Sequence, residues 1–296
     1  MSSMIIVSQN MADIATITTT SSPANLGPEN LKKDLRGLWC RLVGPSNTIT
    51  LKWNNPVPIG AVVIVGSTLK PSSTYRVRVF EDVDGLVLKH DSNWIWAAPG
   101  TTFDNEDWTE ELNTNESPAD GNEFAYSIPP SSAHYLKEQL MGQSVTIELL
   151  DNDSSFIDIS RLVVGPYFSP KVNANYGQSN STIDLTTHSR SASGGLRSEV
   201  GPISRVLSFS LDYVKEGDRG RVQKLMEKSS GSSLWVSLCP GSVDKDLERD
   251  KSIYGRLTSP ISMQWQTLFS HTADFQIEGV RSEEHTSELQ SLSRIS

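Results

Sequence analysis

The sequence contains few of the residues on which metal binding and disulfide cross-linking depend. Two cysteines and five histidines occur in 296 residues. Cys40 and Cys239 lie far apart, and two isolated cysteines in a chain that opens without a secretory signal are more often free thiols than a disulfide. The histidines before the C-terminal tail lack metal-ligand spacing; they are His90, His134, His188 and His271. We therefore expect neither a metal nor a cofactor.

Known catalytic motifs are also missing. The sequence has no G-x-S-x-G nucleophile turn, no H-E-x-x-H zinc motif, no phosphate-binding loop and no dinucleotide fingerprint. Carboxylate pairs such as Glu110/Glu111 or Asp151/Asp153 suit a glycosidase by residue type. Neither pair lies in a stretch with the pattern of a rigid element, so we expect no catalytic residue and no enzymatic activity.

Positive charge and long apolar runs are scarce as well. The net charge is −9, with no basic stripe, which argues against a nucleic-acid partner. The longest apolar run, 59–65, is far too short to cross a membrane. The opening residues MSSMIIVSQNMAD lack the basic and apolar regions of a secretory signal, so we expect synthesis in a cytoplasm and no membrane insertion.

What the sequence does contain is alternation. Apolar and polar residues alternate over 48–53, 75–80, 145–149 and 157–159, the period of half-buried strands. The apolar run 59–65 is typical of a strand buried on both faces. Residues 4–7 form an edge strand or a tether, and a short helix is expected from His134 to Gly142. About eight short strands with proline- and glycine-rich turns predict an antiparallel sandwich or jelly roll over residues 1–168.

Two acidic turns lie between the predicted strands. Asp82-x-Asp84-Gly85 and Asp151-x-Asp153 faintly resemble calcium loops, but both lack the downstream bidentate glutamate. Short Asx side chains also bond the local backbone, so turn chemistry is favoured at both places.

An acidic insertion, rich in aromatic residues, occupies about residues 94–123. It is either a solvated loop between two strands or a binding surface. A flat aromatic ring covers the apolar face of a sugar, and carboxylates accept its hydroxyl protons. Trp94, Trp96 and Trp108 are the candidate ligand-binding residues.

The second part of the chain is smaller. Residues 169–200, rich in Ser, Asn and Gly, predict an extended linker or arm. Residues 201–280 predict a small barrel-like β domain in which one amphipathic helix, at about 215–228, packs across the sheet. The fold class is therefore all-β, mainly strands with one short helix.

The C-terminal tail is treated separately. Residues 281–291, RSEEHTSELQS, resemble the in-frame translation of a widely used short-read sequencing adapter. We expect residues 281–296 to be non-native, from a metagenomic gene assembly, and give them no functional role. The native continuation after Val280 is then unknown.

The order of several segments resembles a known fold family. NLK…WCR, ITLKW, PIGAVVIVGSTL, TYRVRVF and SVTIELLDNDSSFIDISRLVVG together resemble a galactose-binding-like (discoidin-type) jelly roll over about residues 12–168. In that fold Trp39 and Arg41 correspond to a structural element beside the first core strand. Many such domains bind sugars, and many others are purely structural.

The chain also resembles tailed-bacteriophage and prophage virion proteins, most clearly in ISRLVVGPYFSPKVNANYG, RVLSFSLDYV, LWVSLCPG and KSIYGRL. This resemblance implies a non-enzymatic, tail-associated structural protein located in the virion and made in the bacterial host cytoplasm. Its partners would be other virion proteins or further copies of itself as a homo-oligomer, contacted through sheet edges and the 169–200 arm. The alternative is a carbohydrate-binding module that contacts a host-surface glycan.

Overall fold

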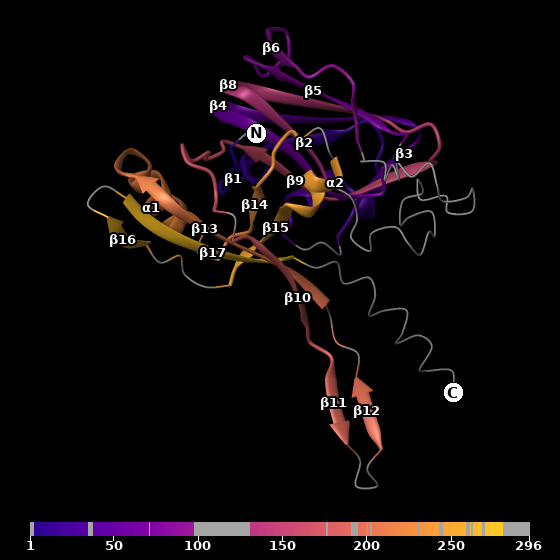
Figure 1. The fold of residues 1–296 in the computed structure, drawn as a ribbon. Coiled ribbons are helices and arrows are strands. Elements are labelled where there is room, and N and C mark those ends of the chain that lie inside the picture. The colour runs from indigo at the N-terminus through magenta and orange to yellow at the C-terminus, as the bar shows by residue number, and fades with distance from the viewer. Residues whose placement is uncertain are drawn as a thin grey trace, which may run out of the picture.

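The computed structural model consists mainly of antiparallel strands (Figure 1), which confirms the all-β prediction. It describes residues 3–34, 38–70, 72–97, 131–175, 177–190, 195–199, 201, 203–229, 231–242, 245–258, 261, 263–267 and 270–280. An eight-stranded sheet contains β2 (Thr16–Thr19), β3 (Cys40–Val43), β4 (Ser46–Ser67), β5 (Thr74–Phe80), β6 (Leu88–Asp91), β7 (Ile95–Trp96), β8 (Ser132–Leu150) and β9 (Phe156–Gly165).

Two long strands divide this sheet into the two layers of a sandwich. The first part of β4, residues 46–52, pairs with β2 and with residues 144–150 of β8. After a register shift between Lys52 and Val57, β4 pairs instead with β9 and with residues 132–142 of β8. Apolar side chains from both layers form one buried core, as predicted for a sandwich; they include Ile17, Leu42, Ile49, Val77, Ile147, Ile159 and Val164.

The short helix expected from His134 to Gly142 is wrong, because these residues continue β8. They pair with residues 57–62 of β4 in the antiparallel ladder. The local pattern is irregular there, and pairing with the long neighbouring strand decides the conformation.

The run 59–65 is buried on both faces, as predicted. Val62 and Ile64 point into the sandwich core, whereas Ala61, Val63 and Val65 belong to a separate cluster against the second sheet. Alternate residues of a strand face opposite sides of its sheet, so each side of this strand needs its own apolar cover.

The second sheet supplies that cover. It contains β1 (Ile5–Val7), β10 (Ser179–Asp184), β13 (Ile203–Lys215), β14 (Leu234–Ser237), β15 (Ser252–Leu257), β16 (Met263–Thr267) and β17 (Ser270–Gly279). The N-terminal β1 is an edge strand of this sheet, paired with β14. Ile5, Val7, Trp235 and Tyr254 pack against β4 and β9 of the sandwich.

Helix α1 (Glu216–Ser229) matches the predicted helix and covers the other face of the second sheet. Its buried Val222 and Leu225 pack in one cluster with Leu207, Phe209 and Phe275 of the sheet. A second helix, α2 (Lys245–Asp250), is short. Among the described residues, no helix combines the length and the apolar character needed to cross a bilayer.

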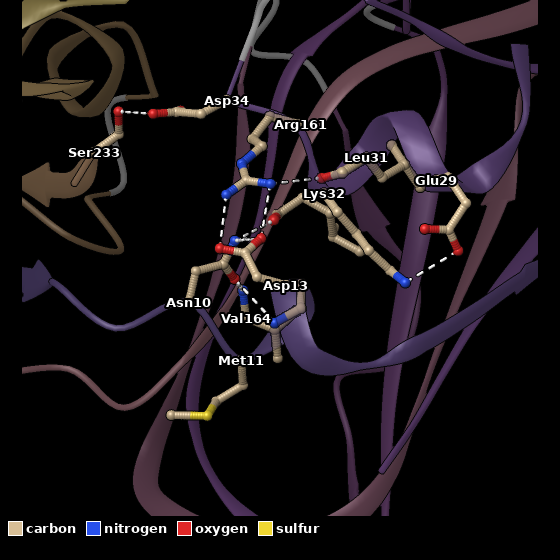
Figure 2. A network of polar contacts seen from close by, with 12 residues as sticks. Asn10, Met11, Asp13, Glu29, Leu31, Lys32, Asp34, Arg161, Val164 and Ser233 are labelled. Atoms are coloured by element: carbon tan, nitrogen blue, oxygen red, sulfur yellow. Dashed lines mark hydrogen bonds and ion pairs between the residues drawn. The ribbon is translucent and has the colours of Figure 1, made fainter. Parts of the chain in front are cut away.

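The buried junction between the sandwich and the second sheet has a charged centre at Arg161 of β9 (Figure 2). The Arg161 residue is only 5% exposed. Its guanidinium pairs with Asp13 at 2.7 Å and donates to the Leu31 carbonyl oxygen at 3.2 Å. Its Nε also donates to the Tyr254 hydroxyl of β15 at 3.0 Å, and that hydroxyl donates to Asp34 at 2.6 Å. One buried cation thus ties together segments from both parts of the chain.

Replacing this arginine by a neutral side chain should destabilise the whole protein. Breaking a buried ion pair costs about 3–5 kcal/mol, and we expect about 3 kcal/mol for Arg161→Met because the Asp13 side chain is 42% exposed. The measurement is urea unfolding followed by tryptophan fluorescence. The matched control is Arg256→Gln, which removes the Arg256–Asp34 pair, in which the Arg256 side chain is 55% exposed, and should cost less than about 1 kcal/mol. Equal losses for the two variants would contradict the assignment of Arg161 as the centre of the junction.

Candidate ligand-binding surface

Two of the three predicted tryptophans lie exposed beside the edge of the sandwich. Trp94 is 49% exposed and Trp96 is 68% exposed. Strand β7 pairs with β5, with Thr74 opposite Trp96 and the buried Tyr75 opposite Ile95. Because Ile95 packs against the core, strand alternation turns the neighbouring Trp96 outward. Trp108 and most of the acidic insertion lie outside the described residues.

A turn anchored by Asp91 leads the chain into β7. The Asp91 carboxylate accepts a hydrogen bond from the Asn93 backbone N–H at 2.9 Å. Asn93 has φ 56°, in the left-handed region that Asn tolerates better than most residues. The Ser92 hydroxyl accepts from the Val77 backbone N–H at 2.8 Å, which ties the turn to β5. The position of Trp94 therefore depends on a fixed turn.

The same carboxylate joins a charged network on the outer face of β5 and β8. Arg76 donates through Nε to Asp91 at 2.8 Å, and its terminal nitrogens also pair with Asp91 and, at 3.7 Å, with Glu148. Arg78 pairs with Glu148 from the next outward position of β5. Hydrogen bonds from Arg76 lower the pKa of Asp91 to about 2. Charged hydrogen-bonding groups thus lie on β5, which pairs with β7, and on β6 and β8, which also pair with β5.

The two acidic turns are turns, as predicted. Asp82 accepts from the Leu86 backbone N–H at 3.0 Å and from the Val87 N–H at 2.7 Å, and these bonds lower its pKa. Asp151 accepts from the Asp153 N–H at 3.0 Å in the turn between β8 and β9. One carboxylate of each turn, Asp82 in the first and Asp151 in the second, thus bonds the local backbone, as turn chemistry requires.

The two cysteines and Arg41 have surroundings that suit a role in stability and not in binding. Cys40 and Cys239 are free thiols, and burial together with the nearby Asp158 raises the pKa of Cys40 to about 12. Arg41 of β3 forms a two-point ion pair with Asp158 of β9, with distances of 2.8 and 2.7 Å. This pair fastens β3 to β9, in agreement with the structural role that the resemblance implies for this element.

A contact between two histidines was not predicted from the sequence. His90 of β6 and His134 of β8 lie with their Nε2 atoms 2.8 Å apart, and partial burial lowers the pKa of His90. Nothing in the local pattern links these positions, because they come together only when the sandwich closes. Within the described part of the chain, no group of three or more His, Cys, Asp or Glu side chains can hold a metal.

Acid should remove the contribution of the Asp91 pair. A carboxyl group whose pKa is lowered by folding stabilises the protein above its ordinary pKa of 3.8, and this stabilisation is lost as the pH falls toward 2. Asp91→Asn should therefore lower the free energy of unfolding by up to about 1 kcal/mol at pH 6, with a smaller difference at pH 2.5. Urea unfolding at both pH values measures this. A difference that stays constant with pH would contradict the Arg76–Asp91 assignment.

Comparisons with known proteins found solved structures of carbohydrate-binding modules, all at low similarity. No family model matches the sequence, and no curated protein matches it. A Streptococcus pneumoniae fucose binding module is 11% identical with a TM-score of 0.35, over 53% of this chain and 94% of the module. The family 32 CBM from C. perfringens NanJ, in complex with galactose, is 11% identical with a TM-score of 0.35, over 55% and 99%. A chitosan-binding module from Paenibacillus sp. IK-5 is 11% identical with a TM-score of 0.35, over 53% and 99%. These values are too low to assign an activity or a site residue to this chain.

Proposed function

We propose that this protein is a non-enzymatic binding protein whose sandwich binds carbohydrate through Trp94 and Trp96. The observation that carries the proposal is the exposure of both indoles beside a fixed strand pair. A structural role would bury large aromatic side chains against the sandwich, whereas a sugar-binding role needs them accessible. A flat ring offers an apolar surface for one face of a pyranose.

The charged groups around β7 suit the same ligand class. Arg76, Arg78, Asp91 and Glu148 carry donors and acceptors on the outer face next to the tryptophans. Sugar hydroxyls both donate and accept hydrogen bonds, so they can add to such a network without a net charge of their own. The natural ligand of this proposal is a neutral glycan on a host cell surface.

Substitution of the more exposed tryptophan separates binding from stability. Trp96→Ala should change the free energy of unfolding by less than about 1 kcal/mol, because little buried area is lost. It should weaken glycan binding by at least about tenfold, or ~1.4 kcal/mol. A glycan array followed by calorimetric titration of the strongest hit is the measurement. Tyr213→Ala is the control, since Tyr213 is an aromatic residue of similar exposure on β13.

Two results would reject the sugar-binding proposal. One is an array on which the unmodified protein binds no glycan. The other is a Trp96→Ala variant that binds normally but unfolds several kcal/mol more easily, which would mean that the indole serves packing.

A second candidate function, assembly with other protein subunits, is favoured by a projecting arm. Strands β10 and β13 extend outward into a hairpin made of β11 (Thr187–Arg190) and β12 (Leu196–Glu199), which points away from the body (Figure 1). The residues of β11 are exposed, and Leu185 before them is 55% exposed. A two-stranded hairpin is at best marginally stable in water without cover.

The arm has a defined base. A Cβ atom at Gly201 would clash with the Leu185 carbonyl oxygen, so only glycine permits the two connecting segments at the base of the arm to approach each other there. The Gly201 backbone N–H also donates to the Thr186 hydroxyl at 3.1 Å. In this proposal the arm docks onto further copies of the chain or onto other proteins of a tailed-phage virion, the setting that the sequence resemblance implies.

Removing the arm should abolish self-association without unfolding the body. We expect the chain without the adapter-like tail, residues 1–280, to form a discrete oligomer. A variant with residues 187–199 replaced by a Gly-Ser linker should be a monomer with an unchanged circular dichroism spectrum apart from the lost strands. Light scattering on a size-exclusion column measures both. A monomeric parent, or a variant that still associates, would reject assembly through the arm in solution.

A further inference from the structure

A concave site lies where α1 meets the segments that follow β1 and β9. Its volume is about 340 Å³, at the small end of the range for ligand pockets. The site is far along the chain from β7, and its lining comes from both parts of the chain. The side chains that could contact a ligand there include Ser8, Gln139, Tyr167, Phe168, Arg221 and Lys224.

The charge of this cavity is opposite to that of the protein. Arg221 and Lys224 are exposed at its rim, three residues apart on α1 and therefore on one side of the helix. Neither forms an ion pair with a described residue, whereas Arg219 on the same helix pairs with Glu216 at 3.2 Å. In a chain of net charge −9, two cations at a concave site that form no ion pair with a described residue favour an anionic ligand over a cationic one.

The opposite wall is neutral and held in place. The Tyr167 hydroxyl donates to the Leu136 carbonyl oxygen at 3.0 Å, and the Gln139 amide donates to the Tyr167 carbonyl oxygen at 2.8 Å. Glycine at position 60 makes room for both, because a Cβ there would lie 2.7 Å from the Tyr167 ring and 2.8 Å from the Gln139 side chain. The wall thus presents a fixed aromatic ring, an amide and the Ser8 hydroxyl.

We propose that this cavity binds a carboxylated sugar. The carboxylate fits Arg221 and Lys224, the apolar face of the ring fits Tyr167 and Phe168, and the hydroxyl groups fit Gln139 and Ser8. A simple inorganic anion would leave the aromatic wall without a partner, and a neutral sugar would leave both cations unpaired. The site is independent of the neutral-glycan surface at Trp94 and Trp96.

The test is calorimetric titration of the unmodified protein with D-glucuronate, N-acetylneuraminate, D-glucose and sodium sulfate. We expect at least one of the two sugar acids to bind at least tenfold more tightly than glucose and sulfate. Its affinity should fall as NaCl rises from 50 to 300 mM, because both cations are exposed to solvent. The double variant Arg221→Gln/Lys224→Gln should lose at least tenfold in affinity for that acid.

Arg219→Gln is the matched control, since it removes a cation from the same helix outside the cavity. Gly60→Ala tests the neutral wall. It should weaken binding of the sugar acid, and the affinity for neutral glycans at the Trp96 surface should stay unchanged. Failure of both sugar acids to bind would overturn the proposal. So would equal binding of sulfate, or equal losses in the control and the double variant. None of these outcomes bears on the Trp96 surface, which is tested with neutral glycans.

Discussion

The structure depends on a layer of strands that is buried on both faces. Residues 59–65 of β4 and most of β9 lie between the sandwich core on one side and the second sheet on the other. Ala61 and Val63 would be exposed to water in a sandwich standing alone, and burial of such apolar area is the main favourable contribution to folding. Arg161 fixes the relative position of the two packed parts. Its buried charge has its hydrogen-bond partners only when Asp13 and Tyr254 are both in place.

The double burial of the β4–β9 layer determines which surfaces of the sandwich can bind a ligand. The second sheet occupies the outer face of the β4–β9 layer, so the opposite layer of the sandwich keeps its outer face for solvent and ligands. The Trp96 surface and the charged network lie on that opposite layer, next to β5. The cavity beside α1 lies instead at the edge of the junction, where residues from both parts of the chain meet. The two proposed binding sites therefore have different structural origins.

Local patterns in the sequence predicted most of the strands and the double burial of 59–65, because alternation and continuous apolar runs report directly on the two faces of a strand. They could not predict that β1 pairs with β14, since that partner is chosen by packing across the whole chain. The irregular stretch after His134 was predicted as helix for the same reason: its pairing with β4 is invisible in its own residues. Exposed Trp94 and Trp96 were chosen by residue type, whereas Asp91, which positions the turn before them, was missed although its Asp-Ser-Asn sequence is typical of turns.

A layer shared by both parts should make the sandwich and the second sheet fold as one unit around β4 and β9. Differential scanning calorimetry of residues 1–280 tests it most directly. We predict a single transition whose calorimetric and van't Hoff enthalpies agree, as for a cooperative two-state protein. Two separate transitions, with one sheet melting while the other remains folded, would contradict it and would mean that the shared layer does not couple the two parts.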